Sequence, residues 1–375
     1  MKRIVILGSA FPLRGGLAAF NERLAVEFQR EGFEVIIYTF SLQYPSFLFP
    51  GKTQYSTDPA PETLNIKIKV NSINPLNWIK VGLDLKQLQP DVLVIKFWLP
   101  FMSPCFGTIA RIAKRNGKTK VISILDNVIP HEKRMFDHSL IRYFVNTCDG
   151  FIAMSKQVLN DLRLFTSVKP AEMIPHPVYD NFGDAVSRDE AVNHLKLDGS
   201  VQYILFFGFI RQYKGLDLLL EAMADKRLLK KNIKLIIAGE FYEDAGHYLA
   251  IMERLQLKDR LILITDFIAD AEVKYYFSAA SLVVQPYRSA TQSGISQIAY
   301  HFEKPMVVTN VGGLPEIVLD GKTGFVTKTE PTEIASAIIR FFEGDFSISM
   351  IPAVQQEKKK YQWQTMTSGI MNLLK

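Results

Sequence analysis

Several features that define other classes of protein are scarce in this chain. Only two cysteines, Cys105 and Cys148, occur among 375 residues, which argues against a disulfide scaffold and is compatible with a reducing compartment. No stretch is of low complexity or polar enough to indicate disorder. The best candidate for a long hydrophobic run, residues 91–107, is interrupted by Lys96 and Pro100, so we expect no membrane span.

We also expect that the opening residues are not a secretory signal. The apolar run after Met1 is short and ends in Gly, Pro and Arg rather than in a small-residue cleavage site, so a first β-strand explains it better. We therefore expect a cytoplasmic protein. The net charge of +6 favours anionic partners such as phosphates or a lipid surface, while no zinc-finger, homeodomain or RNA-recognition signature supports nucleic acid.

What the chain does contain is an alternation of strands and helices. Short β-branched runs, several apolar on consecutive residues, are typical of parallel strands buried on both faces. The strands expected in the first half are 4–7, 34–40, 91–97, 120–125 and 150–155, with a helix over 17–30 after the first.

The same pattern restarts after residues 174–183. Strands are expected at 202–208, 233–239, 261–267, 281–286, 305–310 and 324–327, with helices between them. This predicts an α/β protein with two Rossmann-like domains, residues 1–180 and 181–358. A last helix, residues 359–375, has no strand after it, and we expect it to cross back to the first domain.

A segment rich in Pro, Tyr and Phe, residues 41–63, interrupts the alternation. It follows the second strand, on the side of the sheet where ligands bind in such folds. Both a functional loop and a cover over exposed core remain open for it.

The first candidate site is the glycine turn GSAFPLRGGLAAF, residues 8–20. Its adjacent glycines, Gly15 and Gly16, allow a ligand to approach the backbone at a helix N-terminus that favours an anion. The turn lacks the dinucleotide fingerprint and the P-loop pattern, which disfavours a nicotinamide enzyme or an ATPase. A purely structural turn is the alternative.

The second candidate is FFGFIRQYKG, residues 206–215. Arg211 and Lys214 lie in the turn between a strand and a helix that begins near Gly215. Two cations at the carboxyl end of a parallel strand can clamp a diphosphate and neutralise a departing phosphate without a metal.

The third candidate is a block over residues 286–326. Ser293 and Gly294 precede a helix and offer backbone amides to a phosphate. Glu316 opens another helix, where its carboxylate either caps that helix or binds ribose hydroxyls.

A fourth candidate, LDNVIPHEKRMFDH at residues 125–138, follows a strand. Asp126 and His131 lie on the loop at its carboxyl end, where catalytic groups of such folds gather. Asp126 is a candidate acceptor-side base, or a cap for the next element. His131 is a candidate acceptor ligand, or a hydrogen-bonded loop histidine; the second histidine of a zinc-protease motif is replaced by Met135.

A basic stretch contains Arg111, Lys114, Arg115 and Lys118 at helical spacing. If the helix continues that far, the four cations share one face beside the upstream aromatic residues. That face is a candidate for peripheral contact with the inner face of an anionic membrane. A helix face that is simply solvated is the alternative.

The motifs FGxxRxYKG, AGE, TDFI, KPxVVT and GGLPExVxxGxTG, together, resemble the retaining glycosyltransferases of family 4, which have the GT-B fold. The likeness is strongest over residues 203–326 and weaker in the first half. It implies two Rossmann-like domains facing across a cleft, with the nucleotide-sugar on the second domain, the acceptor on the first, and no metal or other cofactor.

The resemblance also implies roles for individual residues. Arg211 and Lys214 match the pair that binds the pyrophosphate. The remaining donor-binding residues implied by the matching motifs, or by their nearest polar neighbours, are Gly15, Gly16, Glu240, Phe267, Ile268, Gln292, Ser293, Gly294, Gln297 and Glu316.

Three positions depart from the family pattern. Two glutamates eight residues apart are usual in the third block, and here Ala290 and Ile298 occupy their places; Gln292 and Gln297 are the nearest polar side chains. Asp126 stands where a histidine is usual.

The sequence therefore predicts a metal-independent, retaining glycosyltransferase of polysaccharide biosynthesis. It would move a sugar from a nucleotide-sugar to a glycan or a lipid-linked acceptor. The missing glutamates keep open a catalytically weakened nucleotide-sugar-binding protein, and the fold keeps open a nucleotide-sugar epimerase.

Overall fold

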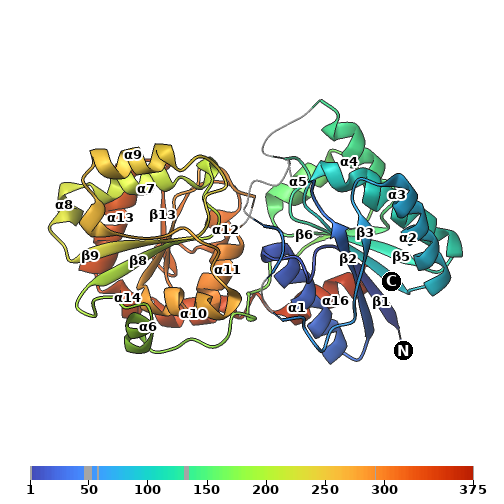
Figure 1. Cartoon of the computed structure of the whole chain (residues 1–375), viewed down its shortest axis with the longest axis horizontal. Helices are drawn as coiled ribbons and strands as arrows, with labels where there is room; N and C mark the ends of the chain where they lie inside the picture. Colours follow the sequence, from blue (N-terminus) through green and yellow to red (C-terminus); the bar gives the residue numbers. More distant parts are fainter. Residues whose placement is uncertain (1, 46–52, 57–58, 131–134, 292, 375) are drawn as a thin grey trace. The chain divides into compact units, whose positions relative to one another are not determined.

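Strands and helices alternate along the chain in a computed structural model, which describes all residues except 1, 46–52, 57–58, 131–134, 292 and 375. The chain divides into two units, each with its own parallel sheet (Figure 1). The first unit comprises Met1–Pro177 and Trp363–Lys375, and the second comprises Val178–Gln362. The prediction of two Rossmann-like α/β domains is therefore confirmed.

The sheet of the first unit has seven strands in the order β3-β2-β1-β4-β5-β6-β7. Every neighbouring pair is parallel, and β4 is buried on all six residues, as expected for a strand that is apolar except for Lys96. The strands are β1 (Arg3–Leu7), β2 (Glu34–Leu42), β3 (Ile66–Asn71), β4 (Val92–Phe97), β5 (Lys120–Leu125), β6 (Gly150–Ala153) and β7 (Ala171–Met173).

Helices cover both faces of this sheet. On one face α1 and α16 lie side by side, and on the other α2 packs against α3 and α3 against α4 (Figure 1). The helices are α1 (Gly16–Arg30), α2 (Pro75–Leu88), α3 (Ser103–Ala113), α4 (Asp137–Val145), α5 (Lys156–Arg163) and α16 (Trp363–Asn372), with 3-10 turns η2 (Pro100–Met102) and η3 (Lys114–Asn116).

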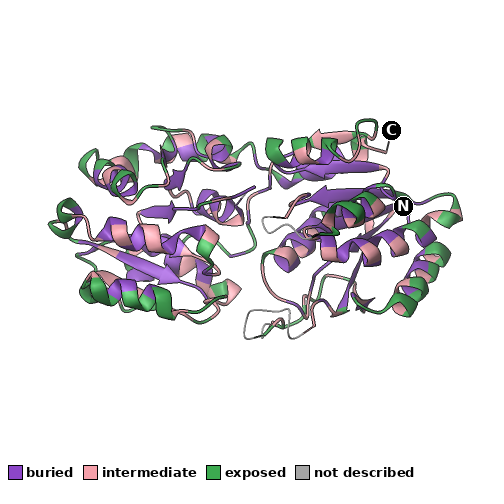
Figure 2. Cartoon of the chain, turned by 90° about the horizontal axis from the view of Figure 1, so that it is seen from above, coloured by how far each residue is buried: buried purple, intermediate pink, exposed green. Residues whose placement is uncertain are grey.

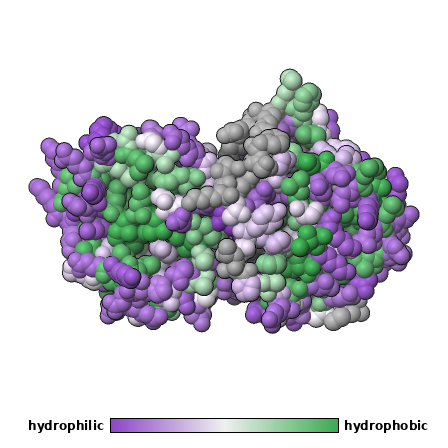
Figure 3. Space-filling model, viewed as in Figure 1, coloured by the Kyte–Doolittle hydropathy of each residue, from purple (hydrophilic) through white to green (hydrophobic). Residues whose placement is uncertain are grey.

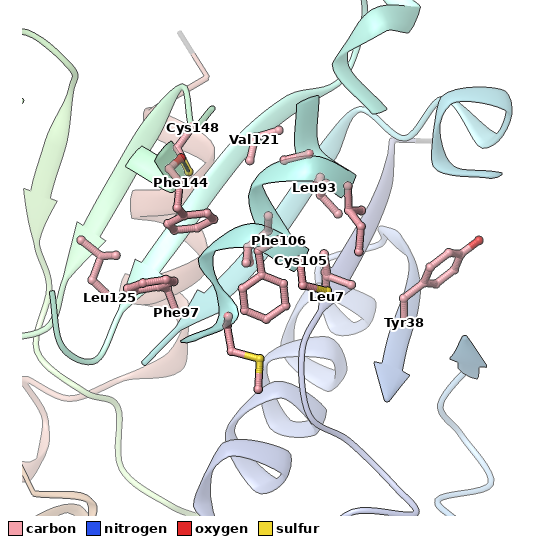
Figure 4. Packing of buried hydrophobic residues seen from close by; sticks show 14 of the residues in the cluster. Leu7, Tyr38, Leu93, Phe97, Cys105, Phe106, Val121, Leu125, Phe144 and Cys148 are labelled. Carbon is pink, nitrogen blue, oxygen red and sulfur yellow. Dashed lines mark hydrogen bonds between the residues drawn. The ribbon is translucent and has the colours of Figure 1, made fainter. Parts of the chain in front are cut away.

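Aromatic side chains fill the space between the sheet and α3 and α4. The rings of Phe97 and Phe144 stack with centroids 4.5 Å apart, and Phe106 packs beside them (Figure 4). Cys105 and Cys148 are both free thiols within this cluster, and burial raises the pKa of each above its ordinary value.

The last helix of the chain, α16, completes the opposite face of the first unit. Trp363 is buried, and its ring lies 5.0 Å from that of Phe20 on α1. The guanidinium of Arg23, one turn further along α1, lies over the Trp363 ring at 5.1 Å from its centroid. The helix begins at Trp363, so the residues from 359 that we expected in it belong to the second unit.

The second unit repeats the architecture with a six-stranded sheet in the order β10-β9-β8-β11-β12-β13. Its strands are β8 (Gln202–Phe207), β9 (Ile233–Ala238), β10 (Leu261–Ile264), β11 (Leu282–Gln285), β12 (Met306–Thr309) and β13 (Gly324–Thr327). Its longer helices are α6 (Arg188–His194), α7 (Leu216–Met223), α9 (Gly246–Arg254), α10 (Asp270–Ala279), α11 (Gly294–His301), α13 (Pro331–Glu343) and α15 (Ile351–Lys358). Shorter elements are η4 (Gln212–Lys214), α8 (Lys226–Leu229), η5 (Lys258–Arg260), α12 (Leu314–Ile317) and α14 (Phe346–Ser349).

Burial follows the layers in both units. In the second unit α7 and α9 cover one face of the sheet, and α6 and α10 cover the other (Figure 1). The strands are mostly buried, and the exposed residues lie on the outward faces of helices and on loops (Figure 2). No helix among the described residues is both long enough and apolar enough to cross a bilayer.

The prediction of one basic helix face over residues 111–118 is wrong. The helix α3 ends at Ala113, and Gly117 adopts a left-handed conformation that turns the chain away before Lys118. Lys114 pairs with Asp149 at 2.6 Å and Lys118 with Asp91 at 3.1 Å. Of the apolar residues just upstream, Met102 and Phe106 are fully buried and Phe101 is half-buried, so these residues do not form a basic face beside exposed aromatic side chains.

Candidate functional site

Each sheet has one point where the strand order reverses, and ligands of such folds bind beside it at the carboxyl ends of the strands. In the second unit the reversal lies between β8 and β11. The parallel pairing of all six strands brings the loops that follow them to this one edge. Most of the predicted donor-binding residues lie on these loops.

Arg211 and Lys214 occupy the loop after β8, directly at the reversal. The chain leaves β8 at Phe207, forms the turn η4 over Gln212–Lys214, and enters α7 through Gly215. Arg211 is exposed, and its guanidinium lies 5.4 Å from the ring of Tyr242. The prediction of two cations in a strand-to-helix turn is confirmed.

Lys214 is unusual because its ammonium is buried. Its side chain extends back along the turn, so that a Cβ atom built on Gly208 would lie 3.2 Å from Nζ. The ring of Tyr287, on the loop after β11, lies 5.8 Å away. Burial, and secondarily the charge of Arg211, lowers the pKa of Lys214 to about 7. An anion bound beside the Lys214 ammonium would offset both the loss of solvation and the repulsion from Arg211.

The glycine that connects Lys214 to α7 has no room for a side chain. Gly215 has φ of 67°, and a Cβ atom there would lie 2.0 Å from the backbone oxygen of Pro286. This close approach holds the loop after β8 against the loop after β11, and it fixes the position from which Lys214 projects.

Ser293 and Gly294 begin α11, as the sequence predicts. Ser293 is the N-cap residue, and its hydroxyl makes no capping bond; its Oγ lies 3.3 Å from the hydroxyl of Tyr287. The amides of the first turn of α11 therefore lack a side-chain acceptor from the cap. The ring of Tyr179 packs against Gly294: a Cβ atom added to Gly294 would lie 3.0 Å from that ring.

Gln297 lies one turn further along α11 and is completely buried. Neither its Nε2 nor its Oε1 has a hydrogen-bond partner in the described structure. A buried amide with both ends unsatisfied is costly, on the order of 1–3 kcal/mol for each group. The two positions where the family carries glutamates, Ala290 and Ile298, are also buried, so Gln297 is the polar side chain next to one of them.

The other predicted donor residues are distributed over the same edge. Glu240 follows β9 and is buried, and its carbonyl accepts a hydrogen bond from the amide of Ile210. Phe267 and Ile268 are half-buried on the loop between β10 and α10. Glu316 is exposed on the four-residue helix α12 after β12.

In the first unit the reversal lies between β1 and β4. Gly15, with φ of 96°, is the N-cap of α1, and Gly16 is the first residue of that helix. The carbonyl of Gly15 accepts hydrogen bonds from the amides of Ala18 and Ala19. The glycine turn therefore lies at the switch point, with the helix N-terminus that the sequence predicts.

Asp126, directly after β5, forms a buried ion pair that the sequence did not reveal. The Nζ atom of Lys96, near the end of β4, lies 2.9 Å from Oδ1 of Asp126, and the Lys96 side chain is only 2% exposed. The same Nζ lies 3.3 Å from the ring centroid of Phe20. Burial lowers the pKa of Lys96, and the charge of Asp126 acts in the opposite direction. The signal for this pair was one lysine inside an otherwise apolar strand.

His176 lies beside the cluster formed by Lys96, Asp126 and Phe20. Burial, and secondarily the charge of Lys96, lowers the pKa of His176 to about 3, so the ring is neutral at physiological pH. Its Nδ1 lies 2.6 Å from the carbonyl oxygen of Pro177, which can only accept, so Nδ1 carries the proton and donates it. The ring also contacts that of Phe20 edge-on at 5.0 Å.

Two predicted residues, His131 and Gln292, lie outside the described residues. Within the described part of the chain, no three His, Cys, Asp or Glu side chains are grouped so that they could hold a metal ion.

The fold is that of the GT-B glycosyltransferases. A family profile described as Glycosyltransferase Family 4 matches residues 14–182, and one described as Glycosyl transferases group 1 matches residues 201–344. The chain therefore belongs to the family of glycosyltransferases that these two profiles describe, family 4 or group 1.

Curated relatives match part of the chain. An uncharacterized glycosyltransferase of Methanocaldococcus jannaschii is 25% identical over 233 residues, which are 61% of this chain and 60% of the relative. A D-inositol 3-phosphate glycosyltransferase of Streptomyces avermitilis is 27% identical over 240 residues, 60% of this chain and 51% of the relative. The match thus spans about half to three fifths of the length of these relatives.

Solved structures agree in fold over nearly the whole chain. Sucrose-phosphate synthase from Thermosynechococcus elongatus has a TM-score of 0.75 at 15% identity, with 99% of this chain and 98% of that chain covered. Anabaena HepE in complex with UDP-glucose has a TM-score of 0.74 at 16% identity, with 99% of both chains covered.

The close approach at Gly215 predicts a stability effect. Gly215→Ala should lower the free energy of unfolding of the second unit by about 2–4 kcal/mol, because the methyl group meets the Pro286 carbonyl in addition to the left-handed strain. Gly117→Ala is the matched control: its φ of 74° is similar and nothing lies within 4 Å, so only about 1 kcal/mol should be lost. Urea unfolding followed by circular dichroism measures both, and equal losses would contradict the steric argument.

The Lys96–Asp126 pair predicts strong coupling between two substitutions. Lys96→Met leaves the buried Asp126 carboxylate without its cation and should cost about 3 kcal/mol, and Asp126→Asn should cost a similar amount. The double variant should lose clearly less than the sum, because neither charge remains.

Tryptophan fluorescence is a selective probe for this experiment. All three tryptophans, Trp78, Trp98 and Trp363, belong to the first unit. Urea unfolding by this signal therefore reports the unit that contains the pair, and strictly additive losses would show that the two groups do not interact.

Proposed function

We propose that this protein transfers a sugar from a nucleotide-diphosphate sugar, bound on the second unit, to an acceptor hydroxyl. The observation that carries the proposal is the buried ammonium of Lys214 beside Arg211, at the switch point of a chain that belongs to this family. A buried cation whose pKa is lowered further by the charge of another cation is in an environment that a diphosphate would stabilise.

The two cations would act mainly on the leaving group. As the bond between the anomeric carbon and the phosphate oxygen stretches, negative charge grows on the departing diphosphate. Arg211 and the protonated Lys214 would stabilise that charge more than they stabilise the bound donor, which accelerates the reaction. The amides of Ser293 and Gly294 would hold the distal phosphate, and no metal would be needed.

The sugar and ribose would be held by uncharged groups where the family has carboxylates. Gln297 is buried next to one of those positions, Ile298, with both ends of its amide unsatisfied, so it can donate to and accept from hydroxyl groups. Glu316 and Glu240 would supply further contacts, and Phe267 and Ile268 would contact the base. Retention of the anomeric configuration follows if the acceptor attacks from the face that the diphosphate leaves.

On the first unit, Asp126 would orient or deprotonate an acceptor hydroxyl. Lys96 would hold the carboxylate in position at the carboxyl end of β5, through the ion pair between its Nζ and Oδ1 of Asp126. We propose a glycan or a lipid-linked sugar as the acceptor class.

A nucleotide-sugar-binding protein with little turnover is the second candidate. The buried Ala290 and Ile298 favour it, because no carboxylate replaces the family's pair. Donor binding without product, across a panel of acceptors, would distinguish it from a transferase. An epimerase would instead change the sugar with no acceptor present.

Donor binding is the first test. UDP-glucose, which HepE binds, should be compared with other UDP-sugars and with GDP-, ADP- and CMP-sugars by thermal shift and calorimetry. One nucleotide should raise the melting temperature, and Arg211→Ala and Lys214→Ala should each weaken its binding by roughly tenfold or more. Lys230→Ala, an exposed cation on the same unit, is the control and should bind as the wild type does. If no nucleotide-sugar binds, the donor site is assigned wrongly.

Binding should also depend on pH through Lys214. Its pKa of about 7 in the free protein must rise when a diphosphate binds, because the anion favours the charged form. Near pH 6 the amine is already mostly protonated, so binding should take up little proton; near pH 8 it should take up close to one. Affinity should therefore fall as pH rises above about 7.

Calorimetry in two buffers of different ionisation enthalpy measures this proton uptake. Lys214→Arg is the control, because a guanidinium does not titrate in this range and should remove the pH dependence. Equal proton uptake by the wild type and by Lys214→Arg near pH 8 would assign the proton to another group.

A further inference from the structure

Two elements proposed to bind the diphosphate, Lys214 and the first turn of α11, meet at Gly208, the residue that follows β8. A Cβ atom added to Gly208 would lie 3.2 Å from Nζ of Lys214 and 3.1 Å from Cδ1 of Ile295, the second residue of α11. The ammonium therefore lies beside the N-terminus of this helix, where one bound anion would contact both.

The Lys214 ammonium is buried without a counter-ion. Its residue is 7% exposed, and among the described residues it forms no ion pair. Hydrophilic side chains, by contrast, cover much of the visible surface of both units, with hydrophobic patches between them (Figure 3). Because a buried cation without an anionic partner is unfavourable, its position marks where an anion would bind.

The N-terminus of α11 is open although its N-cap residue is a serine. The first amides of the helix, those of the half-buried Gly294 and Ile295, have no helical carbonyl four residues earlier to donate to. A serine N-cap usually accepts a hydrogen bond from the second or third amide of its helix. Ser293 has the extended backbone that such a cap requires, with φ of −138° and ψ of 120°, yet its hydroxyl makes no capping bond.

The Ser293 hydroxyl is directed to Tyr287 instead. Its Oγ lies 3.3 Å from the Tyr287 hydroxyl, and both residues are buried. The other serine of this turn, Ser296, is engaged by Gln285, whose Nε2 lies 3.0 Å from the Ser296 Oγ. Neither serine hydroxyl therefore covers the first amides of α11.

The backbone around Tyr287 is fixed by its neighbours. The carbonyl of Tyr287 accepts a hydrogen bond from Oγ1 of Thr309 at 2.5 Å. The amide of Arg288 donates to the carbonyl of Tyr213 at 2.7 Å, and the Arg288 guanidinium binds both carboxylate oxygens of Asp217. The loop after β11 is thus held from two sides, so the Tyr287 hydroxyl has a defined position.

We propose that Tyr287 is a positioning residue of the donor site, a role that rests on the diphosphate site proposed for this unit. Its hydroxyl holds the Ser293 side chain away from α11, so that the amides of Gly294 and Ile295 stay available to a phosphate. The ring of the same tyrosine lies 5.8 Å from the Lys214 ammonium. Without the Tyr287 hydroxyl, the Ser293 hydroxyl would cap its own helix and compete with the phosphate for these amides.

Binding of inorganic pyrophosphate and of UDP to the full chain, measured by calorimetry, tests this role. Tyr287→Phe keeps the ring and should weaken both ligands by roughly fivefold, because the anion must displace a helix cap. Ser293→Ala added to Tyr287→Phe removes the competing hydroxyl and should restore binding to within about twofold of the wild type. Tyr203→Phe is the matched control: its hydroxyl bonds with the backbone of Asp198 at the amino end of β8, and this variant should bind like the wild type.

Hydrogen exchange of the α11 amides, followed by NMR, tests the same contact without a ligand. Tyr287→Phe should slow the exchange of the Ile295 or the Ser296 amide by roughly fivefold, because one of them then donates to the Ser293 hydroxyl. Ser293→Ala in the same background should return that exchange to the wild-type rate. A general loss of packing would instead speed exchange throughout the unit, and the second substitution would not reverse it.

Three outcomes would overturn the proposal. Unchanged exchange in Tyr287→Phe would show that Ser293 does not turn to its helix when the tyrosine hydroxyl is removed. Weaker binding that Ser293→Ala fails to restore would show that the Tyr287 hydroxyl itself contacts the anion. An equally large loss of binding in Ser293→Ala alone would assign that contact to the Ser293 hydroxyl.

Failure of the proposed function gives a different result. The wild type would then bind neither pyrophosphate nor any nucleotide-sugar, and Arg211→Ala and Lys214→Ala would have no binding to weaken. Hydrogen exchange would still decide whether Tyr287 holds the Ser293 hydroxyl away from α11, because that measurement needs no ligand.

Discussion

The parallel pairing of strands in two separate sheets is the constraint on which the rest of the structure depends. Because every strand in a sheet runs the same way, every loop that follows a strand reaches the same edge. The reversal of strand order then separates two neighbouring loops at one point, between β8 and β11 in the second unit and between β1 and β4 in the first. The cations, the helix N-termini and the buried ion pair lie at or beside these two points.

Two buried lysines, Lys96 and Lys214, lie at the carboxyl edges of the two sheets, and their charges are stabilised differently. Lys96 has a carboxylate partner, Asp126, within the protein, so its charge is compensated at all times. Lys214 has no such compensation from Arg211: burial, and secondarily the charge of Arg211, lowers the pKa of Lys214 to about 7. The first arrangement favours a fixed structural charge, and the second favours an ammonium that responds to what binds beside it.

Much of the fold could be predicted from the sequence because buried parallel strands leave a simple signal. Eleven apolar runs identified strands that the structure contains, and the turn with Arg211 and Lys214 was located by a strand, a glycine and a helix in close succession. The strands β3 and β7 were missed because they are edge strands: β3 alternates lysine with isoleucine, and β7 has only three residues.

The parts of the site that could not be predicted depend on contacts between distant segments. Nothing in a lysine within β4 indicates that it will meet Asp126, thirty residues further on and one strand away. Gln297 was identified only as a polar neighbour of a missing glutamate, and its burial with an unsatisfied amide depends on how α11 packs. The prediction of a basic helix face over residues 111–118 was wrong because periodicity does not reveal where the helix ends, and Gly117 turns the chain before Lys118.

The position of α16 has a consequence for how the protein is made. Residues 2–177 of the first unit precede the second unit along the chain, yet the helix that packs on α1, Trp363–Asn372, follows the whole of the second unit. Until the ribosome reaches those codons, Phe20 lacks the Trp363 ring beside it and this face of the first sheet stays open to water. All residues of the second unit emerge before that point, so the unit whose synthesis starts second can complete its core first.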